Sequence, residues 1–67
     1  MTDTASLKAD LKETLEKIKI AEKQHHFTDL KLLYNLAAKI SDKLGRKEEA
    51  QKYREAANEA EKNIKFI

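Results

Sequence analysis

Two adjacent histidines, His25 and His26, are the only imidazoles of the chain and its first candidates for metal or acid–base chemistry. Neighbouring residues of a helix project about 100° apart, so the two rings cannot readily grip one ion. Glu22 and His26 have the four-residue spacing that places both on one helix face. Two ligands are too few for a zinc site, which uses three or four. We therefore expect surface or loop histidines and no metal site.

Carboxylates and tyrosines are the remaining groups that could catalyse a reaction. Paired glutamates occur twice, as Glu48 with Glu49 and as Glu55 with Glu59. Both pairs lie on helix faces expected to be solvated, where nothing would raise a carboxyl pKa for acid–base work. Tyr34 and Tyr53 are expected to fill the core with their hydroxyls at its rim. Because the chain has one glycine, it cannot form a glycine-rich phosphate loop. The sequence predicts neither an enzyme nor a cofactor site.

The composition predicts an almost wholly helical chain, with no proline, one glycine and 39% charged residues. A length of 67 residues makes a single domain, or the N-terminal part of a longer chain. The absence of cysteine excludes disulfides and thiolate sites. No apolar run approaches the roughly 20 residues of a transmembrane helix. We expect a cytoplasmic protein.

Charge is abundant but nearly balanced, with 14 Lys and Arg against 12 Asp and Glu and a net charge of +2. A dedicated nucleic-acid binder would carry a clustered basic face. The lysines are instead interleaved with acids along the chain. Nucleic acid is therefore an unlikely partner by composition.

Apolar residues recur at steps of three and four, which places them on one face of each of three helices. The predicted helices span about residues 5–24, 29–44 and 47–65. Their main stripes are Leu7, Leu11, Leu15, Ile18 and Ala21; Leu30, Leu33, Ala37, Ile40 and Leu44; and Ala50, Tyr53, Ala57, Ala60, Ile64 and Ile67. The middle helix has a wide apolar arc, which predicts that it is sandwiched between the other two. We expect an all-α, antiparallel three-helix bundle.

The helix ends have recognisable signals. Three residues compete as the first N-cap: Asp3, Thr4 and Ser6. The periodicity lapses over residues 23–28, where we expect Thr28 or Asp29 to cap the second helix and Phe27 to pack against it as a staple. Gly45 can adopt the left-handed conformation that closes a helix without a Cβ penalty.

The predicted core consists of the central residues of each apolar stripe. Its members are Leu11, Leu15, Ile18, Leu33, Ala37, Ile40, Leu44, Ala50, Tyr53, Ala57 and Ala60. The third helix contributes mainly alanine, so two backbones can approach closely there. Ile20 lies about half a turn from the first stripe, beside Lys17 and Gln24, and is either a tolerated exposed residue or part of a contact surface.

The two C-terminal helices resemble a tetratricopeptide (TPR) repeat, a helix–turn–helix unit with an aromatic near its start and a glycine at its turn. The matching positions are Tyr34, Ala37 and Ala38, the turn at residues 44–50, and then Tyr53 and Ala57. The resemblance covers about residues 32–63. Two features depart from the family: Ser41 stands where an aromatic is usual, and the closing proline is absent.

The chain also resembles the MIT domain, a three-helix bundle of similar length that binds helical peptides. This resemblance depends on residues 21–23 before the first turn, Leu33 and Tyr34 in the second helix, and residues 53–57 in the third. Both resemblances imply a helical scaffold for protein–protein interaction, and neither implies catalysis.

In TPR proteins the inner face of the repeat's first helix carries the ligand. By position, the resemblance implies a partner-binding face made of Leu32, Asn35, Leu36, Lys39 and Lys43. Ile20 is a further candidate anchor. The carboxylate clamp of some TPR proteins needs an asparagine one residue after Asn35, so it is not carried over. The expected partner is a peptide or helix of another protein.

Two alternatives make different predictions about partners. Three short helices with an alanine-rich third face can self-associate to cover their apolar surface, which would give a structural homodimer. A lysine-rich helix can also bind a polyanion or an anionic membrane surface weakly.

Overall fold

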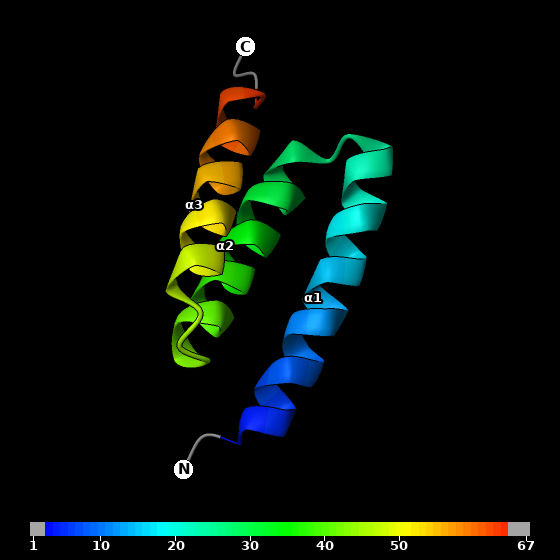
Figure 1. Ribbon diagram of the computed structural model, residues 1–67. Helices are drawn as coiled ribbons and strands as arrows, with labels where there is room; N and C mark the ends of the chain where they lie inside the picture. The colour runs from blue at the N-terminus through cyan, green and yellow to red at the C-terminus, as the bar shows by residue number, and fades with distance from the viewer. Residues whose placement is uncertain (1–2, 65–67) are drawn as a thin grey trace.

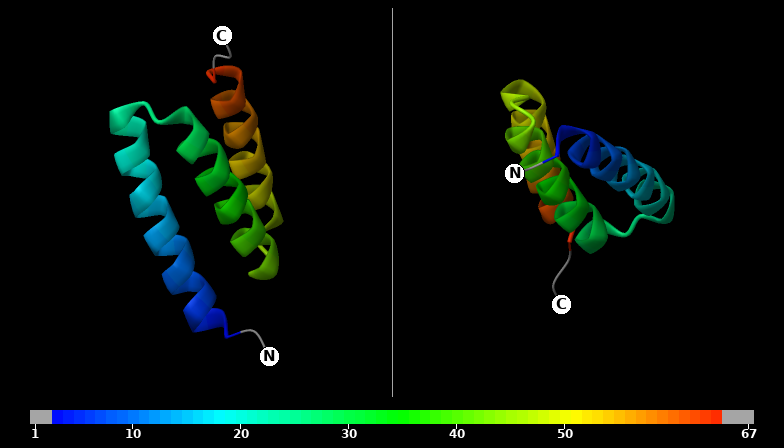
Figure 2. Two further views of the ribbon diagram at one scale, coloured as in Figure 1. Left: turned by 180° about the vertical axis from the view of Figure 1, so that it is seen from behind. Right: turned by 90° about the horizontal axis from the view of Figure 1, so that it is seen from below.

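The second helix lies between the other two and contacts both (Figure 1). The structure is a computed structural model that describes residues 3–64. It contains α1 (Thr4–Gln24), α2 (Phe27–Lys43) and α3 (Lys47–Lys62), and no strand among those residues. Consecutive helices run antiparallel, which confirms the all-α three-helix bundle. The backbone of α2 packs against α1 and against α3, whereas α1 and α3 do not contact each other within residues 3–64. Figure 2 shows this separation from behind and from below.

The N-terminus of α1 is capped by Asp3, one of the three expected candidates. Its carboxylate accepts a hydrogen bond from the Ala5 amide at 3.1 Å, which satisfies one of the free amides of the first turn.

The turn from α1 to α2 takes only two residues. His25 adopts a left-handed conformation (φ 55°, ψ 36°), and the His26 amide donates to the Ala21 carbonyl at 3.0 Å. The His25 amide donates to the Glu22 carbonyl at 3.2 Å. These two bonds are the paired bonds of a Schellman motif, which closes a helix abruptly.

This short turn corrects the predicted start of the second helix. α2 begins at Phe27 rather than at residue 29, and neither Thr28 nor Asp29 is its N-cap. His26 occupies the cap position without a side-chain cap bond, and its carbonyl accepts the Leu30 amide at 2.9 Å. Phe27 is therefore inside the helix, where it is half-buried and packs against the core.

The second turn has the same construction and confirms the predicted role of Gly45. Gly45 has φ 78°, its amide donates to the Asp42 carbonyl at 3.1 Å, and the Arg46 amide donates to the Ser41 carbonyl at 2.8 Å. α2 ends at Lys43, one residue before the predicted end, with Leu44 as its C-cap. α3 begins at Lys47 as predicted and ends at Lys62; its predicted end at residue 65 lies outside the described residues.

The core largely follows the predicted stripes. One cluster joins α1 to α2 and Ala60, and its buried members are Leu7, Leu11, Ile18, Ala21, Leu30, Ala37, Ile40 and Ala60. Four predicted core residues are only half-buried: Leu15, Leu33, Leu44 and Tyr53. Ala50 and Ala57 are also buried, on the helix whose backbone approaches that of α2 among residues 3–64.

The two left-handed turn residues, His25 and Gly45, lie 20 residues apart, and the apolar stripes of α2 and α3 are offset by the same number of residues. The side of each helix that faces its predecessor is apolar in α2 (Leu30, Leu33, Ala37, Ile40, Leu44) and in α3 (Ala50, Tyr53, Ala57, Ala60, Ile64). The corresponding side of α1 is exposed and mostly polar: Asp10, Glu13, Lys17, Ile20 and Gln24. Ile20 is thus the exposed counterpart of buried Ile40 and Ala60.

Candidate functional site

Three large apolar side chains are exposed within the described part of the chain. Ile20 on α1 is 57% exposed, and Leu32 and Leu36 on α2 are 62% and 47% exposed. Leu32 and Leu36 are four residues apart and therefore share one face of α2. Scattered exposed apolar residues are normal, but a group of them marks a contact surface.

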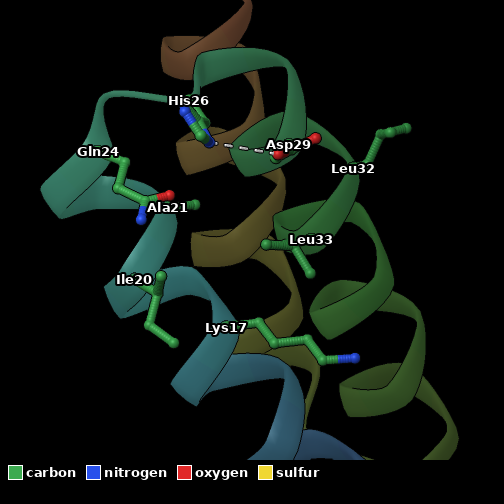
Figure 3. A pocket seen from close by; sticks show the side chains of 8 residues that line it. All are labelled: Lys17, Ile20, Ala21, Gln24, His26, Asp29, Leu32 and Leu33. Carbon is green, nitrogen blue, oxygen red and sulfur yellow. Dashed lines mark ion pairs between the residues drawn. The ribbon is translucent and has the colours of Figure 1, made fainter.

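Ile20 and Leu32 line a common groove between α1 and α2, close to the first turn (Figure 3). The groove has a volume of about 370 Å³. Its lining comes from α1 (Lys17, Ile20, Ala21 and Gln24) and from the α1–α2 turn and α2 (His26, Asp29, Leu32 and Leu33). We call this surface the α1–α2 groove. Figure 3 shows Leu33 between the two helices and Leu32 directed outward from α2.

The other predicted partner-binding residues lie on α2 but outside this groove. Asn35, Leu36, Lys39 and Lys43 are all exposed, on the outward side of the helix. The structure therefore places Ile20 and Leu32 in the lining of one groove, on opposite helices, and leaves Leu36 one turn further along α2. The three polar residues continue the same face towards the second turn.

Charged side chains at the groove interact mainly with neighbours on their own helix. His26 Nδ1 lies 3.6 Å from Asp29 Oδ2, which makes an ion pair when the imidazole is protonated. Lys17 Nζ lies 3.5 Å from Glu13 Oε1. Both pairs are more than half exposed and contribute little to stability. Lys17, His26 and Asp29 of these two pairs form the polar rim of the groove, and its apolar residues form the floor.

Sequence reasoning did not assign Lys17, Gln24, His26 or Asp29 to a contact surface. Lys17 and Gln24 could have been found, because they flank Ile20 in helical register. His26 and Asp29 could not, since their position depends on the two-residue turn that the sequence did not predict.

Tyr34 connects all three helices on the other side of α2. Its hydroxyl donates a hydrogen bond to Glu22 Oε1 at 2.8 Å, and its ring stacks on Tyr53 with 6.4 Å between centroids. Burial is the largest of the effects that together raise the pKa of Tyr34 to about 12, and the hydrogen bond to the Glu22 carboxylate is the next. Both tyrosines are half-buried, and the Tyr34 hydroxyl lies at the core rim as expected.

Glu22, the predicted helical neighbour of His26, thus accepts a hydrogen bond from Tyr34. Among residues 3–64, no three His, Asp or Glu side chains gather closely enough to hold a metal ion. None of the three helices over that range has the length and apolar character needed to cross a membrane. Comparisons with protein-family models, with curated proteins and with solved structures find no match to this chain.

Proposed function

We propose that this chain is a non-enzymatic interaction module whose α1–α2 groove receives a helix or peptide of another protein. The observation that carries the proposal is the position of its exposed apolar residues. Ile20 and Leu32 line one groove, with Leu36 on the same face of α2 as Leu32. An apolar floor with a polar rim is the usual anatomy of a protein–protein interface.

The TPR and MIT resemblances support the same class of function. The helix–turn–helix with a left-handed Gly45 and the small residues at the α2–α3 contact are compatible with both families. We propose a relationship to one of these peptide-binding scaffolds as the origin of the groove.

Within this proposal, the apolar residues Ile20, Leu32 and Leu36 anchor the partner. Asn35, Lys39 and Lys43 then form a polar rim along α2, where they bind the partner's backbone or acidic side chains. Large apolar anchors usually carry most of the energy of an interface, and exposed charges tune its rate and specificity. Because the chain has no cysteine, its fold needs no oxidising compartment, and we place the interaction in the cytoplasm.

Affinity capture from a lysate, quantified by mass spectrometry, tests the proposal. The test variant is Leu32→Glu/Leu36→Glu, which places two charges on the proposed anchors. The matched control is Gln51→Glu/Asn58→Glu, which adds the same charge at exposed positions of α3. We expect the test variant to lose partners that the wild type and the control retain. If the folded test variant captures every protein that the wild type captures, the groove is not the binding site.

Self-association is the competing function, because a second copy could cover the same exposed leucines. Light scattering from micromolar to millimolar concentration distinguishes the two. A wild-type dimer that Leu32→Glu/Leu36→Glu converts to a monomer would favour the structural homodimer over the adaptor.

A further inference from the structure

A second groove lies on the opposite flank of α1 and is basic. Its rim is formed by Lys8, Lys12 and Lys19 of α1 and by Arg46 of the α2–α3 turn. Leu11 and Leu15 lie beneath them, and Glu16 is the one acid in the lining. We call this surface the basic groove. In a chain with a net charge of +2, it is a local concentration of positive charge.

The basic groove is lined by α1 on one side and by Arg46 of the α2–α3 turn on the other. On α2, Ala37 belongs to the cluster shared with α1, whereas its neighbour Ala38 is buried outside that cluster. Adjacent residues of a helix project about 100° apart. α1 and α3 therefore pack on different sides of α2.

The lysines of this groove, Lys8, Lys12 and Lys19, form no ion pair with a carboxylate of the described residues. Arg46 approaches only Glu49, at 3.7 Å, and both side chains remain at least 40% exposed. Leu15 lies between Lys12 and Lys19 in the sequence and is half-buried, so part of its side chain is exposed to solvent.

We propose that the basic groove binds an acidic amphipathic helix of a partner, which packs beside α1 and the α2–α3 turn. Its apolar residues would cover Leu15, and its carboxylates would face Lys8, Lys12, Lys19 and Arg46. Lys8 and Lys19 are separated by roughly 16 Å along α1, so about three turns of the partner helix make the contact.

The apolar residues of the basic groove, Leu11 and Leu15, favour an acidic amphipathic helix over other anionic partners. Nucleic acid and anionic membranes would engage the lysines through phosphates but would leave Leu15 unmatched. An amphipathic helix supplies both a charged and an apolar side, the usual mode of helix-in-groove recognition. This site is separate from the α1–α2 groove and does not depend on the function proposed for that groove.

Titration of a fluorescent probe peptide tests the inference. The probe is an 18-residue helix with leucines on one side and glutamates flanking them, and its matched control carries glutamine in place of glutamate. We expect the glutamate peptide to bind at least tenfold more tightly than the glutamine peptide. Higher ionic strength should weaken that binding, because it screens exposed charges.

Protein variants locate the binding surface. Lys12→Glu/Lys19→Glu should weaken probe binding at least tenfold, whereas Lys23→Glu/Lys52→Glu makes the same charge change at exposed positions outside both grooves and should leave it unchanged. Leu32→Glu/Leu36→Glu should also bind the probe normally, which separates this test from that of the α1–α2 groove. If Lys12→Glu/Lys19→Glu does not fold, Lys12→Gln/Lys19→Gln replaces it, with an expected loss of a few-fold.

Several results would overturn the inference. It fails if the probe does not bind at millimolar protein, or if Lys12→Glu/Lys19→Glu binds it as well as the wild type. It also fails if heparin or anionic vesicles bind the wild type more tightly than the probe does, since the surface would then be a general polyanion site.

Discussion

His25 is exposed and has a left-handed backbone conformation, which glycine would adopt without strain. Gly45 occupies the equivalent position of the second turn, where a Cβ would meet nothing within 4 Å. The cost of a side chain at either site therefore comes from the backbone alone. We expect His25→Gly to stabilise the fold by about 0.5–1 kcal/mol and Gly45→Ala to destabilise it by about 1 kcal/mol. Denaturant unfolding measures both, and a less stable His25→Gly would show that the imidazole contributes to the turn.

Ser41 is the one described residue whose buried side-chain oxygen lacks a hydrogen-bond partner within residues 3–64. It is 0% exposed, whereas Thr14, the other buried polar residue, donates to the Asp10 carbonyl at 2.8 Å. Leaving a hydroxyl buried and unpaired costs about 1–3 kcal/mol. Ser41→Ala should therefore raise the free energy of unfolding by about 1 kcal/mol. Thr14→Val, which removes a hydroxyl that is paired, provides the comparison and should gain less. A destabilised Ser41→Ala would mean that the hydroxyl has a partner in solution.

At the scale of elements, the α2–α3 contact depends on small residues. Ala57 is 3% exposed, and α2 is the one described helix that can cover it. A leucine there would push the helices apart, so Ala57→Leu should destabilise the fold by about 1–3 kcal/mol. Asn58→Leu makes a similar change at the next, exposed position and should be nearly neutral. Thermal unfolding of both variants gives the comparison; equal melting temperatures would show that the alanine face is not a tight contact.

The extents of the helices could be predicted because their apolar residues recur every three or four positions. The end of α1 could be predicted, but the start of α2 could not. Its position depends on a left-handed His25, and histidine is not a reliable signal for that conformation, whereas Gly45 is. The exposure of Leu32 and Leu36 and the ambiguous position of Ile20 also followed from periodicity. Their grouping did not, because it depends on how α1 packs on α2.

At the scale of the whole molecule, the gap between α1 and α3 was not foreseen. Periodicity indicates that α2 is covered on two sides, but it does not give the angle between those sides. The sequence does show that the apolar stripes of α2 and α3 match at an offset of 20 residues.

Tyr34 holds this open arrangement together, because it bonds to Glu22 on α1 and stacks on Tyr53 of α3. Its pKa is raised to about 12 in the fold, against about 10 in the unfolded chain. The unfolded state therefore loses this proton first, so the stabilisation is complete below pH 10 and is lost as the pH rises to about 12. Because Tyr34 is partly exposed, we expect the loss to be about 1 kcal/mol, less than the full shift would imply.

Lysines also titrate in this range, so the informative quantity is the difference between the wild type and Tyr34→Phe. That difference in the free energy of unfolding should decrease between pH 9 and pH 12, because the phenylalanine variant has no phenol to ionise. Glu22→Gln keeps a hydrogen-bond acceptor but removes the charge, and it should lower the pKa of Tyr34, which tyrosinate absorbance would report. A pH-independent difference, with Tyr34 ionising near pH 10, would show that the contact between Tyr34 and Glu22 does not persist in solution and that α1 is held by its apolar stripe alone.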